Sequence, residues 1–114
     1  MNTILEQLEA EILSWEGVIV RPHRFGGIEF QYRGKELGHL HGESIADLLF
    51  PRNMRNELVE SGRAHPHHIY PDSGWVTRYI RGAEDVPAVI ELFRMQYERM
   101  KGDSFERSVE PKEQ

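Results

Sequence analysis

Residues 28–42 constrain the fold more than any other segment, because their pattern describes two strands joined by a tight turn. Apolar and polar side chains alternate from Ile28 to Arg33, as they do in a strand with one buried face. The pair Gly34-Lys35 fits a two-residue hairpin turn, with glycine first to accept a positive φ, and the returning strand is expected from Glu36 to about Gly42. The sequence therefore predicts an antiparallel hairpin in the middle of the chain.

Three helices are predicted around this hairpin. Thr3-x-x-Glu6 has the form of a capping box, and the helix that it begins is expected to end near Trp15. Pro51 favours the first turn of a second helix that stops at Gly62. The final helix has the clearest pattern, with apolar residues at helical spacing from Val86 to Met100 and an expected end at Gly102.

Further strands are expected at residues 18–20 and 75–80, and an extended segment at residues 65–70. Residues 43–50 fit no single element. The predicted fold class is α+β: a two-layer domain with an antiparallel sheet of about four to five strands and helices packed on one face. The other sheet face must then be solvated, covered by a partner or used for binding. Residues 4–101 are expected to form this single domain, and residues 102–114 a polar mobile tail.

Composition removes several classes of function. The chain of 114 residues contains no cysteine, which excludes disulfides and thiolate sites. No stretch approaches the roughly 20 apolar residues that a membrane span requires, so no membrane association is expected. The formal net charge of −5 does not suit a nucleic-acid binder, whose affinity comes from neutralising phosphates. A cytoplasmic location is the default expectation.

Six histidines lie at positions 23, 39, 41, 65, 67 and 68. Strand geometry places His39 and His41 on one face, roughly 6.5–7 Å apart along the chain. That arrangement suits two imidazoles that converge on a metal ion or on one substrate. His67 or His68 could join them, but only one of the two is expected to, because adjacent strand residues point oppositely. The carboxylates that could complete such a site are Glu43, Asp47 and Asp72.

Three interpretations of these histidines stay open. General acid–base chemistry suits imidazole, which titrates near neutrality. No cofactor is predicted, and a divalent metal at His39 and His41 is the alternative, although H-x-H alone fixes no third ligand. The histidines could also be structural or surface residues. The residues singled out as catalytic are His39, His41 and His67, and those expected to bind a substrate are Arg63, Asp72 and Trp75.

The order of motifs from Glu36 to Ile80 resembles the luciferase-domain family. The segments that carry this resemblance are Glu-Leu-Gly-His-Leu-His-Gly at 36–42, Leu49-Phe50-Pro51, Gly62-Arg63-Ala64, His67-His68 and Ser73-Gly74-Trp75-Val76-Thr77. The family takes its name from fungal luciferases, which oxidise a hydroxypyrone with molecular oxygen. The resemblance covers roughly residues 4–101. It implies that His39, His41 and His67 are the family's histidines, and that Asp72 and Trp75 belong to its turn-and-tryptophan segment.

Together these observations predict a domain that binds a small-molecule ligand and acts as a cofactor-independent, oxygenase-like enzyme. One imidazole would deprotonate a phenol or enol, a neighbouring imidazolium would stabilise the negative charge, and Trp75 would wall the pocket. Two alternatives remain. The first is a non-catalytic interaction module that forms a homodimer or binds a partner through the uncovered sheet face. The second is a histidine/carboxylate metal-binding protein.

Overall fold

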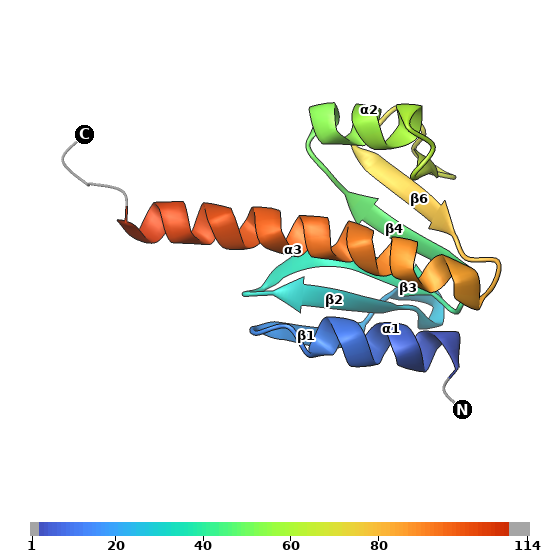
Figure 1. Ribbon diagram of the computed structural model, residues 1–114, viewed down its shortest axis with the longest axis horizontal. Coiled ribbons are helices and arrows are strands. Elements are labelled where there is room, and N and C mark those ends of the chain that lie inside the picture. The colour runs from blue at the N-terminus through green and yellow to red at the C-terminus, as the bar shows by residue number, and fades with distance from the viewer. Residues whose placement is uncertain (1–2, 110–114) are drawn as a thin grey trace.

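A six-stranded antiparallel sheet forms the centre of the protein, with strands in the order β1-β2-β3-β4-β6-β5 (Figure 1). The computed structural model describes residues 3–109, and side chains as far as residue 102. The strands are β1 (Val18–Pro22), β2 (Ile28–Tyr32), β3 (Lys35–His41), β4 (Ile45–Leu49), β5 (His65–Pro66) and β6 (Trp75–Tyr79). The predicted α+β class is confirmed, with slightly more strands than the expected four to five. The strand that the sequence did not reveal is β4.

The helices are α1 (Ile4–Leu13), α2 (Arg52–Glu60) and α3 (Val86–Val109), with short 3-10 turns η1 (Arg24–Gly26) and η2 (Ala83–Asp85). Figure 1 shows α1 and α3 side by side across the same face of the sheet, and α2 beside β5 and β6 at its other end. The capping box of Thr3 and Glu6 is confirmed, since each side chain accepts a hydrogen bond from the backbone N–H of the other residue. None of the described helices has the length and apolarity needed to cross a membrane.

Two local predictions are wrong. The hairpin turn consists of Arg33 and Gly34, both with positive φ (52° and 83°), because Tyr32 pairs directly with Lys35. Helix α3 continues through Gly102 to Val109. Of the predicted mobile tail, residues 110–114 lie outside the described residues, and its mobility stays a prediction. The predicted extended segment 65–70 begins with strand β5 at His65 and Pro66, and an irregular loop follows.

A bulge in the central hairpin decides which side chains of β3 face the helices. Phe30 pairs with Gly38 and Gln31 with Glu36, so that Leu37 is the extra residue. Leu37 joins the buried core, and a Cβ at Gly38 would lie only 2.9 Å from Cε1 of Phe93 in α3. The bulge thus turns Leu37 toward the helices, and the carboxylate of Glu36 lies beside His39 instead. Regular alternation along β3 would have placed Leu37 on the face of His39 and His41, and the bulge prevents this.

Candidate functional site

The sheet face opposite α1 and α3 contains a cavity of about 530 Å³. His39 and His41 reach it because they alternate along β3 with Gly38 and Leu40, which face the core. The residues that line the cavity are His23, Arg24, Phe25, Glu36, His39, His41, Ile45, Asp47, His67, His68, Ile69, Tyr70 and Trp75. Five of the six histidines therefore meet in one place.

Asp47 lies at the centre of this cluster, on β4. Strand pairing places it between His39 on β3 and Thr77 on β6, in one row across the sheet. Its side chain is fully buried, and Oδ1 accepts a 2.7 Å hydrogen bond from the hydroxyl of Thr77. Four imidazole Nε2 atoms lie close to Oδ2, at 3.2 Å (His39), 3.5 Å (His41), 3.5 Å (His67) and 3.1 Å (His68). We call Asp47 and these four histidines the Asp47 cluster.

His39 and His67 differ in the hydrogen bonds that their second ring nitrogen, Nδ1, makes. In His39, Nδ1 lies 2.6 Å from a carboxylate oxygen of Glu36, so it carries a proton and donates it to that oxygen. In His67, Nδ1 accepts hydrogen bonds from the backbone N–H groups of Ile69 (3.1 Å) and Tyr70 (3.0 Å). An acceptor nitrogen has no proton, so the ring proton of His67 sits on Nε2 and points toward Asp47.

The pKa values of the residues in this cluster are shifted in different directions. Burial lowers the pKa of His39, but hydrogen bonds to Asp47 and Glu36 outweigh this effect and raise it to about 9. Burial would raise the pKa of Asp47, yet hydrogen bonds from His39, Thr77 and His68 hold it well below its usual range. Burial, together with the positive charge of His39, lowers the pKa of both His41 and His67. The central pair is thus an aspartate and an imidazolium.

A further histidine, His23, adds to the cluster from the loop before η1. Its ring stacks on that of His39 with centroids 3.9 Å apart, and its Nδ1 lies 2.8 Å from a carboxylate oxygen of Glu29. The sequence analysis assigned His23 no role, because a lone histidine after a strand carries no spacing signal. The available hint was Glu29, which pairs with His39 in the hairpin and so places a carboxylate on the same face.

The structure brings together some of the predicted site residues but not others. His39, His41, His67 and Trp75 all line the cavity, and His68 does so as well. The expectation that only one of His67 and His68 can join is wrong, because the strand ends at Pro66 and the two rings no longer alternate. Trp75 packs against His39 and His67, with ring centroids 5.4 and 5.7 Å away.

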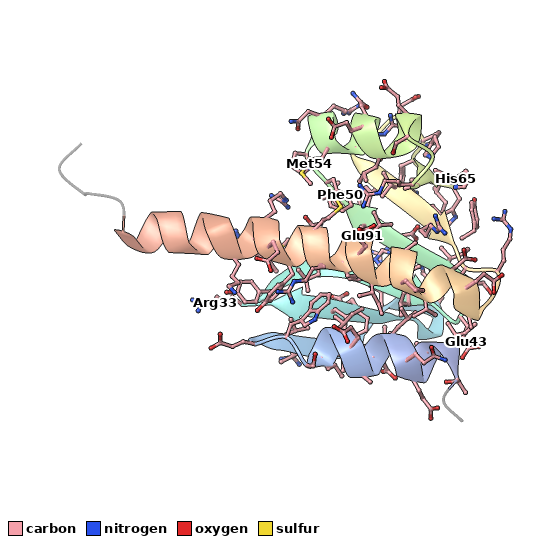
Figure 2. The ribbon with its side chains drawn as sticks, viewed as in Figure 1. Arg33, Glu43, Phe50, Met54, His65 and Glu91 are labelled. Atoms are coloured by element: carbon pink, nitrogen blue, oxygen red, sulfur yellow. The ribbon has the colours of Figure 1, made fainter. Side chains whose placement is uncertain are left out.

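Arg63 and Asp72 do not line the cavity. The guanidinium of Arg63 donates a hydrogen bond to Glu91 on α3. Of the carboxylates considered for the site, Asp47 is present, whereas Glu43 accepts a hydrogen bond from the backbone N–H of Leu5 at the start of α1. Figure 2 shows Glu43 at that end of the sheet and His65 at its outer edge, where the ring of His65 packs against Tyr79.

Apolar side chains are exposed around the cavity. Phe25 is 95% exposed, and Ile69 and Tyr70 are about 60% exposed. Phe25 also has a φ of 58°, in the left-handed region that a bulky residue rarely occupies. Because strained residues of this kind concentrate at ligand-binding sites, this rim is a candidate contact surface for a bound molecule.

Thr77 offers a direct test of how the cluster is held. Changing Thr77 to valine keeps its shape but leaves Oδ1 of Asp47 without its hydroxyl donor. We expect the free energy of unfolding to fall by about 1–3 kcal/mol, the usual consequence of leaving a buried polar atom unpaired. Urea denaturation measures this change, and Thr77→Ser, which keeps the hydroxyl, is the control. Equal losses in the two variants would contradict the proposed role of the hydroxyl.

Comparison with known protein families gives a match over the candidate site. The family model described as "Luciferase domain" matches residues 34–96, more than half of the chain. No curated protein and no solved structure gives a significant match. The matched range contains the whole Asp47 cluster and Trp75, whereas His23 and Phe25 precede it.

Proposed function

The chain belongs to the luciferase-domain family, and from this premise we propose that it binds a small organic molecule in the cavity and oxidises it with molecular oxygen. The observation that carries the proposal is the convergence of four imidazole nitrogens on one oxygen of Asp47, at the floor of a cavity. Buried ionisable groups that perturb one another's pKa values in a cleft are typical of active sites.

The size and lining of the cavity support small-molecule binding. Its volume of about 530 Å³ lies within the usual range for ligand sites, roughly 300–1,000 Å³. One wall is formed by the indole of Trp75, and the rim by Phe25, Ile69 and Tyr70. A molecule with a flat apolar part would pack against these side chains and would direct a polar end toward the imidazoles. His39, His41 and His67 are then the residues that bind this reactive end.

The oxidation itself rests on the family. Fungal luciferases, which this chain resembles, oxidise a hydroxypyrone, an electron-rich ring with an acidic hydroxyl. The floor of the cavity suits such a group, because imidazole nitrogens both accept and donate hydrogen bonds. We therefore propose a phenol or enol as the substrate class and oxygen as the oxidant.

Binding and oxidation can be measured separately. A hydroxypyrone is added to the full-length protein, its binding is followed by the NMR shifts of the Trp75 indole, and oxygen uptake is followed with an electrode. We expect saturable shifts and protein-dependent uptake, both lost in His41→Ala. A probe that neither shifts the indole of Trp75 nor consumes oxygen would contradict the proposed function.

The rim gives a further prediction. Phe25→Ala is expected to weaken binding of the same hydroxypyrone by about tenfold, because the ligand loses an apolar contact surface. Stability should not fall, since Phe25 packs against nothing in the core. Ile19→Ala is the matched control, because Ile19 is also an exposed apolar residue but lies outside the cavity. Equal affinities of the two variants would remove the rim from the binding site.

A further inference from the structure

We propose that the floor of the cavity is a metal site, in which His39, His41 and Asp47 bind a divalent first-row transition-metal ion. The proposal rests on the geometry of the cluster and does not require the organic ligand proposed above. Its three ligands come from two adjacent strands, β3 and β4.

The separations between the donor atoms fit one shared ion. Oδ2 of Asp47 lies 3.2 Å from Nε2 of His39 and 3.5 Å from Nε2 of His41. Metal bonds of roughly 2.0–2.2 Å, at the angles found in tetrahedral or octahedral sites, place neighbouring donor atoms roughly 3–3.5 Å apart. His39 and His41 also each offer a ring nitrogen within 4.8 Å of the other. An ion can therefore bind with small movements of the side chains.

The outer hydrogen bonds give the histidines the tautomer that a metal needs. A histidine that binds a metal through Nε2 usually donates its Nδ1 proton to a carboxylate or carbonyl. His39 makes this bond to Glu36 at 2.6 Å, and His23 makes it to Glu29 at 2.8 Å. Two carboxylate–histidine pairs thus lie at the same cavity. In the pair that contains His39, Nε2 faces Asp47, and an ion would replace the proton that joins these two residues. The bulge in β3 is what places Glu36 beside His39.

The position of the ring proton excludes His67 from the metal site. Its Nδ1 accepts two backbone N–H bonds, so Nε2 carries the proton and has no lone pair for a metal. Asp47, His67 and His68 also lie close enough together to hold an ion, but His67 has no Nε2 lone pair to offer it. His67 therefore serves as a hydrogen-bond donor that positions the carboxylate of Asp47.

The donor types narrow the choice of ion. Imidazole and carboxylate suit iron, cobalt, nickel, copper and zinc. The chain has no cysteine, whose thiolate would favour softer metal ions such as Cu⁺. Two histidines and one carboxylate with open positions are typical of non-haem ferrous iron sites that react with oxygen. The negative charges of Glu29, Glu36 and Asp47 around the floor also favour a cation. The choice of ferrous iron rests on the proposed oxidation, whereas Co²⁺ and Zn²⁺ are expected to bind the same ligands in any case.

The experiment uses full-length protein that has been purified without an affinity tag and stripped with a chelator. Zn²⁺ is titrated by calorimetry, and Co²⁺ by its visible absorption. We expect one ion per chain with a dissociation constant in the micromolar range or below. His41→Ala should weaken binding by about 100-fold or more, because it removes a direct ligand. The matched control is His65→Ala, because His65 lies outside the cavity and packs against Tyr79. This variant should bind the metal ion as tightly as the unmodified protein does.

A second pair of variants tests the outer hydrogen bond without touching a ligand. Glu36→Gln is expected to weaken metal affinity by about 10–100-fold, whereas Glu57→Gln, on the exposed face of α2, should have no effect. Unchanged affinity in His41→Ala, or no binding at stoichiometric concentrations, would overturn the proposal. Since these titrations contain no organic ligand, ion binding without hydroxypyrone binding would reject only the proposed function. Hydroxypyrone binding and oxidation without ion binding would reject only the metal site.

Discussion

Replacing Asp47 by alanine is expected to lower the free energy of unfolding of the metal-free protein by about 3–5 kcal/mol, the usual cost of removing one partner from a buried ion pair. The carboxylate is fully buried and is the shared partner of Thr77 and the four imidazoles. Its removal leaves the imidazolium of His39 facing other imidazoles, with only Glu36 as a counter-charge. For a small domain, this loss is a large part of the total stability.

Urea denaturation followed by circular dichroism measures this loss. Asp47→Asn should be less damaging, because an amide oxygen can still accept the hydrogen bond from Thr77. Glu91→Ala is the control: it removes a carboxylate from an exposed ion pair with Arg63, and such pairs contribute little. If the Asp47 and Glu91 variants were equally stable, the carboxylate would not be what organises the cluster.

The second large effect is expected at the other face of the sheet. Phe93→Ala should lower the free energy of unfolding by about 3–5 kcal/mol, because it opens a cavity in the core. The ring of Phe93 is fully buried and meets Phe30 edge-on, with centroids 5.5 Å apart. It also lies against Gly38, whose lack of a side chain lets α3 approach β3. The contact therefore holds the helix layer on the strand that bears His39.

Phe25→Ala is the matched control for this variant, since the same atoms are removed from a side chain that is 95% exposed. Its free energy of unfolding should stay close to that of the unmodified protein, and thermal denaturation of the two variants side by side makes the comparison. A small loss in Phe93→Ala would mean that α3 repacks onto the sheet. Metal titration of this variant would then show whether the cluster tolerates the repacking.

The sequence predicted elements well wherever one face is buried and the other is solvated. The alternation of residues 28–33 and the helical stripe from Val86 to Met100 both correspond to elements of the structure. Strand β4 was missed for the opposite reason. Its residues Ala46, Asp47 and Leu48 are buried on both faces, so they show no alternation of apolar and polar side chains.

The candidate site was predicted in part. The spacing of His39 and His41 was sufficient to place both on one face, because side-chain direction in a strand repeats every two residues. Asp47 was only one of three carboxylates considered, and His23 was assigned no role. Arg63 and Asp72 were expected to bind a ligand but lie outside the cavity. For Asp47 the sequence lacked the neighbours across the sheet, and for His23, Arg63 and Asp72 it lacked the path of the loops that carry them.

By itself, the sequence determined the properties that depend on residues close together in the chain: the fold class, the central hairpin, the final helix and the shared face of His39 and His41. Only the tertiary structure decided that Asp47 pairs with both His39 and Thr77, and that His23 stacks on His39. It also decided that a bulge turns Leu37 into the core and leaves Glu36 beside His39. The physical reason is that a periodic pattern records which face of an element is buried. The register between strands, which chooses one carboxylate from several for the imidazoles, is fixed by packing between distant segments.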